Sequence, residues 1–489
     1  MHISLIAALL LTATTPVFAA DEKPATPEFA PLPADKTIHQ SAVIAGKPVG
    51  YDVTVGTIPI SDAKGKKIGE VVFTAYTVAN KAGARPVTFA FNGGPGAASA
   101  FLNFGAIGPK RVQFGGQGDA PSDSAVARDN PHSWLDFTDL VFIDPIGTGF
   151  SRSLEDEAGT KRDFFTAQAD IEYLSRVIFD WLNKNGRMTA PHYLVGESYG
   201  GYRVPRVAYF LQSRLGVGLN GITMVSPYLN PGAVDGGQNA LSPLPYMISL
   251  PSMAAANLER QGKLTGPVAL AEVENYDRTE YAADLFRGRS DPQAIERMTA
   301  KVSAYIGLDP VIVRRSEGRV DIGTYLREVH RAEGKIGSVY DSNVTAYDPF
   351  PGAPQQQSND PILDAIIAPA TGAAVDLMTN QVGWKVNARY NLLSYEVNGA
   401  WARDNSDSPV SDLRKAIAND PKMAVMIAHG WDDLSCPYFT SKLVIDQMPS
   451  FGQAQRIHLH VYPGGHMFYA RSDSAQAFKR DAMEAYGLR

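Results

Sequence analysis

The stretch "PHYLVGESYGGYRV", residues 191–204, decides how this chain folds. A short apolar run leads into Ser198, which stands between Gly196 and Gly200 in the pattern G-x-S-x-G. In that pattern a strand turns sharply into a helix, and the serine is held exposed in strained backbone. The stretch therefore predicts a strand, a tight turn and a helix, with Ser198 as a candidate nucleophile. The alternative is a glycine-rich turn in which the serine has no chemical role.

The same kind of apolar run recurs along the chain. Short runs end in turn residues at 86–92, 139–145, 220–226, 423–430 and 456–465. Strands that are apolar throughout are typical of a parallel sheet covered on both faces. Helical patterns lie between these runs, and the alternation predicts an α/β fold.

Two other patterns refine this fold. Residues 51–60 and 69–78 alternate apolar and polar residues, which predicts antiparallel strands with one wet face. The clearest helical pattern, residues 165–186, carries an apolar stripe and ends at Gly186, and Asp163 is its expected N-cap.

The N-terminus indicates export. Residues 1–20 contain no acidic residue, no Lys and no Arg, and their apolar middle ends in small residues. This pattern predicts a signal peptide and an exported protein, periplasmic or secreted, while a short membrane anchor is the alternative. No later segment reads as apolar enough to span a bilayer, so we expect no membrane association after signal cleavage.

The rest of the 489 residues divide by pattern. Residues 21–45 are rich in Pro, Ala and charge and predict a flexible tether. Residues 46–228 and 376–489 are the expected two parts of one core. Residues 229–375, with helical patterns near 291–305 and 322–334, are the expected lid insertion over the sheet.

The charge and the cysteine content limit the interactions that we expect. The net charge is −6 and no Lys/Arg cluster is present, so we expect no nucleic-acid binding. Cys436 is the single cysteine, which excludes an intrachain disulfide. The composition gives no indication of the oligomeric state.

A nucleophilic serine needs a histidine base, and the base needs an acid to orient it. When the chain order is serine, acid, histidine, four histidines remain as candidates: His429, His458, His460 and His466. His466 is the best of them because it directly follows a strand on the glycine-rich loop "YPGGHMFY". Asp432 and Asp433, in "HGWDDLSCP", are the candidate acids.

A zinc site is the rival interpretation of these histidines. His458, His460 and His466 with an aspartate could ligate a metal, but their spacing matches no metal motif and leaves the serine turn unexplained. We therefore expect no metal and no cofactor.

A second glycine-rich loop, "FNGGPGAAS" at residues 91–99, follows a predicted strand. It lacks both G-x-G-x-x-G and a following Lys-Ser/Thr, so a phosphate cradle is disfavoured. We expect an oxyanion hole instead, formed by the backbone N–H groups of Gly94 and Tyr199, the residue after the candidate nucleophile.

With these pieces placed, the sequence resembles the serine carboxypeptidase family. The motifs that carry the resemblance occur in that family's order from about residue 70 onward: "FNGGPGAAS", "GAIGPKRV", "FIDPIGTGFS", "GESYGG", "HGWDDLSCP" and "GGHM". The resemblance implies an α/β-hydrolase fold, with a mixed, mostly parallel sheet flanked by helices and a helical lid. It also implies removal of single residues from peptide C-termini.

The resemblance assigns site residues one by one. It implies a triad of Ser198, Asp433 and His466, oxyanion donors at Gly94 and Tyr199, and a carboxylate-binding group of Asn92, Gly93 and Glu197. A protonated Glu197 could donate a hydrogen bond to a substrate carboxylate, which favours acidic pH or a raised pKa.

The chain departs from the family at several positions. The family usually has a second glutamate, sharing a proton with the recognition glutamate, where this chain has Ala106. Ala97 replaces a common cysteine, Arg203 stands where a tyrosine is frequent, and the family's disulfides are absent. The missing carboxyl pair removes one cause of a raised pKa at Glu197.

The expected function is therefore a serine carboxypeptidase that acts on peptide or protein C-termini through an acyl-enzyme. An acyltransferase or esterase on the same scaffold is the second hypothesis, and a non-catalytic binding module is the third.

Overall fold

The structure is a computed structural model of the whole chain, and it describes residues 30–79, 85–112, 119–229, 242–353, 356–402, 408–451 and 456–488. The predicted signal peptide lies outside the described residues.

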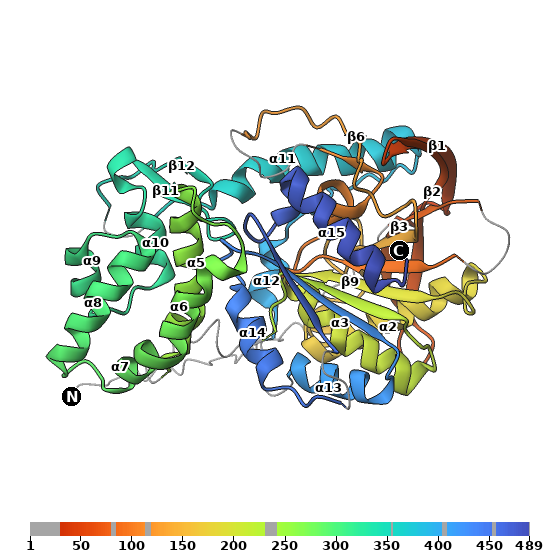
Figure 1. Cartoon of the computed structure of the whole chain (residues 1–489). Coiled ribbons are helices and arrows are strands. Elements are labelled where there is room, and N and C mark those ends of the chain that lie inside the picture. The colour runs from red at the N-terminus through yellow and green to blue at the C-terminus, as the bar shows by residue number, and fades with distance from the viewer. Residues whose placement is uncertain are drawn as a thin grey trace, which may run out of the picture.

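One large mixed sheet forms the centre of the described part of the chain (Figure 1). Its strands follow the order β1-β2-β3-β7-β4-β9-β10-β13-β14, and β8 pairs with β3. Their bounds are β1 Lys36–Ile44, β2 Lys47–Ser61, β3 Lys67–Thr77, β4 Val87–Phe91, β7 Asp139–Ile143, β8 Arg152–Ser153, β9 His192–Glu197, β10 Gly221–Val225, β13 Ala424–Gly430 and β14 His458–Tyr462. Two short pairs lie apart from it: β5 Lys110–Arg111 with β6 Arg128–Asp129, and β11 Lys335–Gly337 with β12 Thr345–Tyr347.

The sheet changes character along this order. The pairs β1–β2, β2–β3 and β3–β7 are antiparallel, whereas β7, β4, β9, β10, β13 and β14 run parallel. The predicted parallel strands are all present, within a few residues of the expected bounds. The solvent-exposed face expected for residues 69–78 is wrong for β3, because alternate residues of this strand belong to the two hydrophobic cores on opposite faces of the sheet.

Helices pack on both faces of the sheet. On one face, α2 (Ala167–Lys184), α3 (Tyr199–Phe210) and α13 (Pro409–Asn419) share a core with residues such as Leu194. On the other face, α11 (Pro361–Val375), α15 (Ser472–Ala485) and the π-helix η1 (Leu102–Ile107) share a core with Tyr193 and Val195. Neighbouring residues of β9 thus serve opposite cores, as the period of two in a strand requires.

The remaining helical segments near the sheet are short. They are α1 Glu157–Phe164, η2 Leu211–Leu215, η7 Asp376–Gln381, α12 Tyr395–Ala400, α14 Tyr438–Asp446 and η8 Phe468–Ala470.

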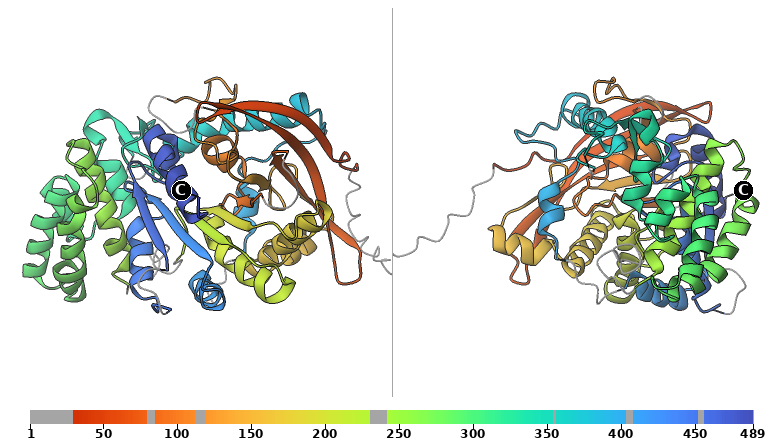
Figure 2. Two further views of the ribbon diagram at one scale, coloured as in Figure 1. Left: turned by 45° about the vertical axis from the view of Figure 1, so that its right-hand side comes forward. Right: turned by 90° about the vertical axis from the view of Figure 1, so that its left-hand side faces the viewer.

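A helical lobe stands beside the sheet, at the left in Figure 1 and in the left view of Figure 2, on the side away from β1–β3. It has its own core, which also takes in residues of α14 and of the loop after β13. Its elements are α5 Leu244–Arg260, η4 Pro267–Leu270, α6 Ala271–Tyr276, η5 Asp277–Tyr281, α7 Ala282–Phe286, α8 Pro292–Ile306, α9 Pro310–Arg315, α10 Ile322–Glu328 and η6 Arg331–Glu333. This lobe comprises fewer residues than the insertion expected over 229–375, because α11 belongs to the core of the sheet instead.

Three further sequence expectations need correction. The tether does not reach residue 45, since Lys36–Ile44 form β1 and gain a full antiparallel ladder with β2. Asp163 is not an N-cap: it lies inside α1, and the hydroxyl of Thr166 accepts the N–H of Ala169 at the start of α2. Contrary to expectation, one described helical segment, Pro361–Gln381, is long and apolar enough to cross a membrane, and half of it is buried in the molecule, as in a core helix.

Candidate active site

Ser198 occupies the predicted tight turn between β9 and α3. Its backbone has φ 61° and ψ −120°, a conformation that side chains larger than glycine rarely adopt. Only glycine fits on either side: a Cβ on Gly196 would lie 2.1 Å from the carbonyl oxygen of Gly200, and one on Gly200 would lie 2.5 Å from that of Phe91. The N–H of Ser198 donates to the carbonyl of Val225 at 2.9 Å, which ties the turn to β10.

His466 and Asp433 come together from the loops after β14 and β13. The Nδ1 atom of His466 lies 2.8 Å from Oδ2 of Asp433, and both side chains are buried. The other carboxylate oxygen of Asp433 accepts the N–H groups of Ser435 at 2.8 Å and Cys436 at 2.9 Å. Burial alone would lower the pKa of His466, but the charge and hydrogen bond of Asp433, together with the charges of Glu197 and Asp360, raise it.

The loop of His466 is fixed through its backbone. Ser226, at the end of β10, donates its hydroxyl to the carbonyl of His466 at 2.9 Å. The N–H of His466 donates to the carbonyl of Tyr340, which follows the helical lobe. Ser198 and His466 line the same cavity, which has a volume of about 260 Å³.

The other candidate histidines and Asp432 contact groups other than Ser198. Nε2 of His429 lies 2.8 Å from the hydroxyl of Ser441, and burial lowers the pKa of His429 to about 4. Asp432 is buried, with an oxygen 3.7 Å from the guanidinium of Arg471, and burial raises its pKa. His460 lies 3.4 Å from Asp481, on the outer strand of the sheet. Within the described residues, no group of three or more His, Cys, Asp or Glu side chains is placed to hold a metal.

The second glycine-rich loop lies against the serine turn. A Cβ on Gly93 would lie 2.5 Å from the backbone nitrogen of Tyr199 and 2.9 Å from the Cβ of Ser198. Gly94 has φ +99°, and both Gly94 and Tyr199 line the cavity with Ser198. The two backbone segments expected to supply oxyanion donors therefore border the same space as the serine.

Glu197 and Asn92 form the second polar group of the cavity. Asn92 donates its side-chain N–H to Oε2 of Glu197 at 2.8 Å, and its own side-chain oxygen accepts the N–H of Leu102 at 2.9 Å. Tyr469 donates its hydroxyl to the same carboxylate. Burial raises the pKa of Glu197 to about 7, although His466, Tyr469 and Asn92 act in the opposite direction.

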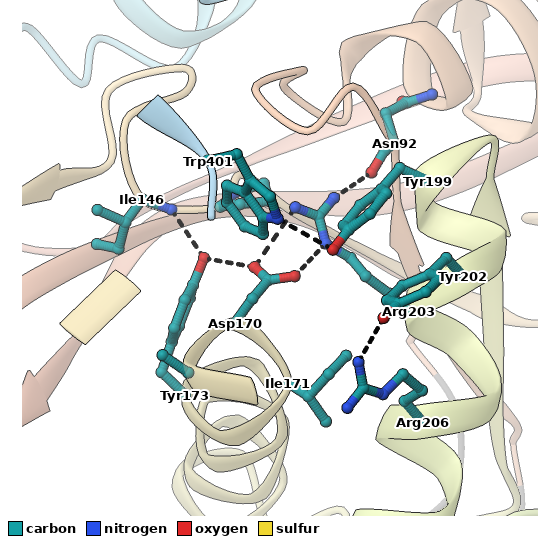
Figure 3. A network of polar contacts seen from close by, with 12 residues as sticks. Asn92, Ile146, Asp170, Ile171, Tyr173, Tyr199, Tyr202, Arg203, Arg206 and Trp401 are labelled. Carbon is teal, nitrogen blue, oxygen red and sulfur yellow. Dashed lines mark hydrogen bonds and ion pairs between the residues drawn. The ribbon is translucent and has the colours of Figure 1, made fainter. Parts of the chain in front are cut away.

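A buried ion pair supports this group from below (Figure 3). Nε of Arg203 lies 2.6 Å from Oδ2 of Asp170, and both side chains are fully buried. Arg203 also donates to the backbone carbonyl of Asn92 at 2.6 Å, and its guanidinium lies 5.1 Å from the ring centre of Tyr199. The pair thus joins α2, α3 and the glycine-rich loop.

Sequence reasoning gave neither Arg203 nor Tyr469 a role. Asp170 is a charged residue beside the apolar stripe of α2, and this offered a signal for a buried partner. Tyr469 follows His466 by three residues and carries no pattern of its own.

The remaining cavity lining is largely apolar and aromatic. Among the described lining residues, Glu197 and His466 are the charged or imidazole groups, and there is no Lys, Arg or Asp. The lining includes Phe101, Tyr199, Tyr202, Tyr228, Tyr340, Leu363, Leu393, Trp401, Cys436 and Met467.

Comparison with curated proteins gives partial alignments. "Serine carboxypeptidase-like 36" of Arabidopsis thaliana is 31% identical over 208 residues, which cover 42% of this chain and 40% of that protein. A probable serine carboxypeptidase of Homo sapiens is 30% identical over 164 residues, covering 31% of each chain. The alignments thus span less than half the length of either relative.

Comparison with solved structures identifies the fold. Kex1(delta)p, a prohormone-processing carboxypeptidase from Saccharomyces cerevisiae, matches with a TM-score of 0.56 at 15% identity, covering 89% of this chain and 91% of that one. The shared fold is that of the α/β hydrolases, with the mixed, mostly parallel sheet described above.

The sequence pattern of the family described as serine carboxypeptidase matches residues 62–474. That range contains β3 to η8, both glycine-rich loops and the loops of Asp433 and His466, and it ends within the first turn of α15. Because the match covers most of the chain, this protein belongs to the serine carboxypeptidase family.

Proposed function

We propose that this protein is a serine carboxypeptidase that removes single residues from peptide C-termini. One observation carries the proposal: a single cavity is bordered by Ser198, the Asp433-paired His466, the glycine-rich loop and the Glu197–Asn92 pair. The first three suit acyl transfer, and the fourth suits recognition of a terminal carboxylate.

The proposed chemistry begins at Ser198. Because Nδ1 of His466 faces Asp433, Nε2 is the nitrogen that takes the serine proton as Oγ attacks the scissile carbonyl carbon. The N–H groups of Gly94 and Tyr199 stabilise the negative charge on the carbonyl oxygen. His466 then gives the proton to the departing amine, the acyl-enzyme forms, and water releases the shortened peptide by the same steps.

Recognition of the carboxylate depends on the proton of Glu197. A neutral Glu197 donates to the substrate carboxylate, together with Asn92 and the Gly93 N–H, whereas an ionised one repels it. Since the pKa of Glu197 is raised to about 7, the neutral form is present below that pH and is lost as pH rises through it. His466 must be neutral to act as base, so activity on peptides should also fall at low pH. The pH profile should therefore be bell-shaped, and its two apparent pKa values belong to the interacting pair of His466 and Glu197 rather than to either residue alone.

A comparison of free and amidated peptides tests this proposal. A blocked dipeptide with a free carboxylate should lose its last residue below pH 7 with a kcat/KM about 10- to 100-fold higher than its amidated analogue, because a hydrogen bond to a charged group is worth about 1.5–3 kcal/mol. The measurement is product release by chromatography across pH 5–9. Equal cleavage of both peptides at every pH would contradict carboxylate recognition.

Glu197→Gln is the matched variant for this experiment. Glutamine stays neutral at all pH values and keeps an N–H donor, so the variant should lose the alkaline fall in affinity for the free-carboxylate peptide. It should stay active on a small ester without a carboxylate, since Ser198 and His466 are unchanged, with the acidic limb moved to lower pH because the Glu197 charge no longer raises the pKa of His466. An alkaline limb that persists in the variant would show that another group controls it.

We further propose that the protein is exported, as residues 1–20 indicate. Expression of the full chain in a Gram-negative host should yield periplasmic protein whose N-terminal sequence begins near residue 20 or 21. Recovery of the protein in the cytoplasm with residues 1–20 intact would contradict export.

A further inference from the structure

Tyr469 occupies a special position beside Glu197. Its hydroxyl lies 2.9 Å from Oε1 and 2.9 Å from Oε2 of Glu197, so one donor spans the whole carboxylate. The side chain of Tyr469 is fully buried on the short helix η8. This helix packs against η1, the segment that carries the buried Ala106.

The other neighbours of Glu197 are few. Asn92 donates to Oε2, and His466 and Asp433 act on Glu197 through their charges. Arg111, which donates to the carbonyl of Ala470 at 3.3 Å, lies near Tyr469, and Asp360 acts on His466. Asp433 is engaged with His466 and with backbone N–H groups, so the described groups around Glu197 give it no second carboxyl with which to share a proton.

We propose that Tyr469 is a positioning residue for the terminal carboxylate of the substrate, and that its hydroxyl takes the place of the second carboxyl group expected at residue 106. This inference rests on the proposed function. A phenol differs from a carboxyl partner because it keeps its proton across the working pH range; burial holds the pKa of Tyr469 well above its ordinary value. It therefore always donates to Glu197 and never takes the proton of Glu197.

Two consequences follow from a permanent donor. The first concerns geometry: Tyr469 contacts both oxygens of Glu197 whereas Asn92 contacts only Oε2, so Oε1 is the oxygen with fewer donors and the one we expect to carry the proton. The second concerns pH. A donor to the carboxylate favours its ionised form, which opposes the effect of burial and limits how far the pKa of Glu197 rises. The recognition of free carboxylates should therefore end near neutral pH in the native protein.

Tyr469→Phe tests this role with the loss of one oxygen atom. Without the donor, the ionised form of Glu197 loses a stabilising bond, so the alkaline limb of kcat/KM for the free-carboxylate peptide should move up by about one pH unit. The change should appear in KM, with kcat nearly unchanged below the limb. A limb that stays in place or moves to lower pH would overturn the inference.

Tyr462→Phe is the matched control. Tyr462 is also buried and donates its hydroxyl to a carboxylate, that of Asp481 at 2.8 Å, but it lies at the end of β14, and Asp481 is on α15. Its loss should leave the alkaline limb unchanged. A shift of equal size in both variants would mark a general effect of losing a buried hydroxyl and would contradict a specific role for Tyr469.

An infrared titration separates this inference from the proposed function. The carboxylic acid stretch of Glu197, assigned by its absence in Glu197→Gln, should disappear at higher pH in Tyr469→Phe than in the wild type. This result does not depend on peptide cleavage. If the wild type cuts amidated peptides equally well, the proposed function fails, while the titration still decides whether Tyr469 controls Glu197. If Tyr469→Phe does not fold, a fluorinated tyrosine at position 469, a stronger donor, should move the titration to lower pH, and no movement would overturn the inference.

Discussion

Replacing Ser198 with alanine is expected to abolish release of the C-terminal residue, with kcat falling on the order of a millionfold. The serine is the only member of the proposed triad that bonds to the substrate, and its turn leaves no room for another side chain to take over. Gly196 and Gly200 are both closed in by backbone atoms, and Gly93 lies against the turn from the other side. The residual rate should reflect binding and the oxyanion donors alone.

The measurement for Ser198→Ala is peptide release at high enzyme concentration, together with labelling by an organophosphonate and mass spectrometry of the labelled peptide. The wild type should carry one label on Ser198 and the variant none. Ser213→Ala, a change at an exposed serine on η2, is the matched control and should keep both labelling and activity. Labelling of the Ser198→Ala variant at another residue, with activity retained, would contradict the assignment.

Replacing Arg203 with methionine is expected to lower the free energy of unfolding by about 3–5 kcal/mol, because it leaves the charge of Asp170 buried without its partner. Both side chains are fully buried, and Tyr173 remains as a donor to Asp170 at 3.0 Å. The backbone carbonyl of Asn92 also loses its donor. The folded fraction of the variant should therefore bind free-carboxylate peptides more weakly, with a raised KM.

Urea unfolding followed by circular dichroism measures the stability change. The double variant Arg203→Met with Asp170→Leu should recover most of the loss, because replacing both charges by apolar groups of similar volume is often neutral. Arg314→Met is the exposed control: its pair with Glu296, at 2.5 Å, is 60% and 68% exposed, and its loss should cost no more than about 1 kcal/mol. If the single variant Arg203→Met is as stable as this control, the buried pair does not contribute to the free energy of unfolding as proposed.

Short-range pattern predicted much of the core. Each apolar run near 86–92, 139–145, 191–197 and 220–226 is a strand, since a run of apolar residues before a turn has few other uses in an α/β protein. The tether and the cap of α2 were mispredicted from the local pattern. A strand at the edge of a sheet is stabilised by its neighbour rather than by its own composition. Asp163 belongs to α1, and Thr166 is the residue that caps α2.

In the candidate site, too, some residues could be predicted from motifs and others could not. The motifs indicated Ser198, His466, an aspartate at 432 or 433 and the glycine-rich loop. In the structure Ser198, His466 and this loop line one cavity, and Asp433 contacts His466 behind it. The separation of Asp433 from Asp432 came from the resemblance, because two adjacent aspartates look alike in a sequence. In the fold one faces His466, while the other is turned toward Arg471.

By itself, the sequence determined the parallel strands of the core and their order along the chain, the serine turn and the residue types that suit acyl transfer. These features depend on residue type and on spacings of a few residues, which a linear pattern records. Only the tertiary structure decided which side chains other than the expected Asn92 contact Glu197. Its contact with Tyr469 joins residues 272 positions apart, and the contact of Arg203 with Asn92 joins residues 111 positions apart. Such contacts are set by the packing of η8 on η1 and of α3 on α2, and packing in three dimensions leaves no period in the sequence.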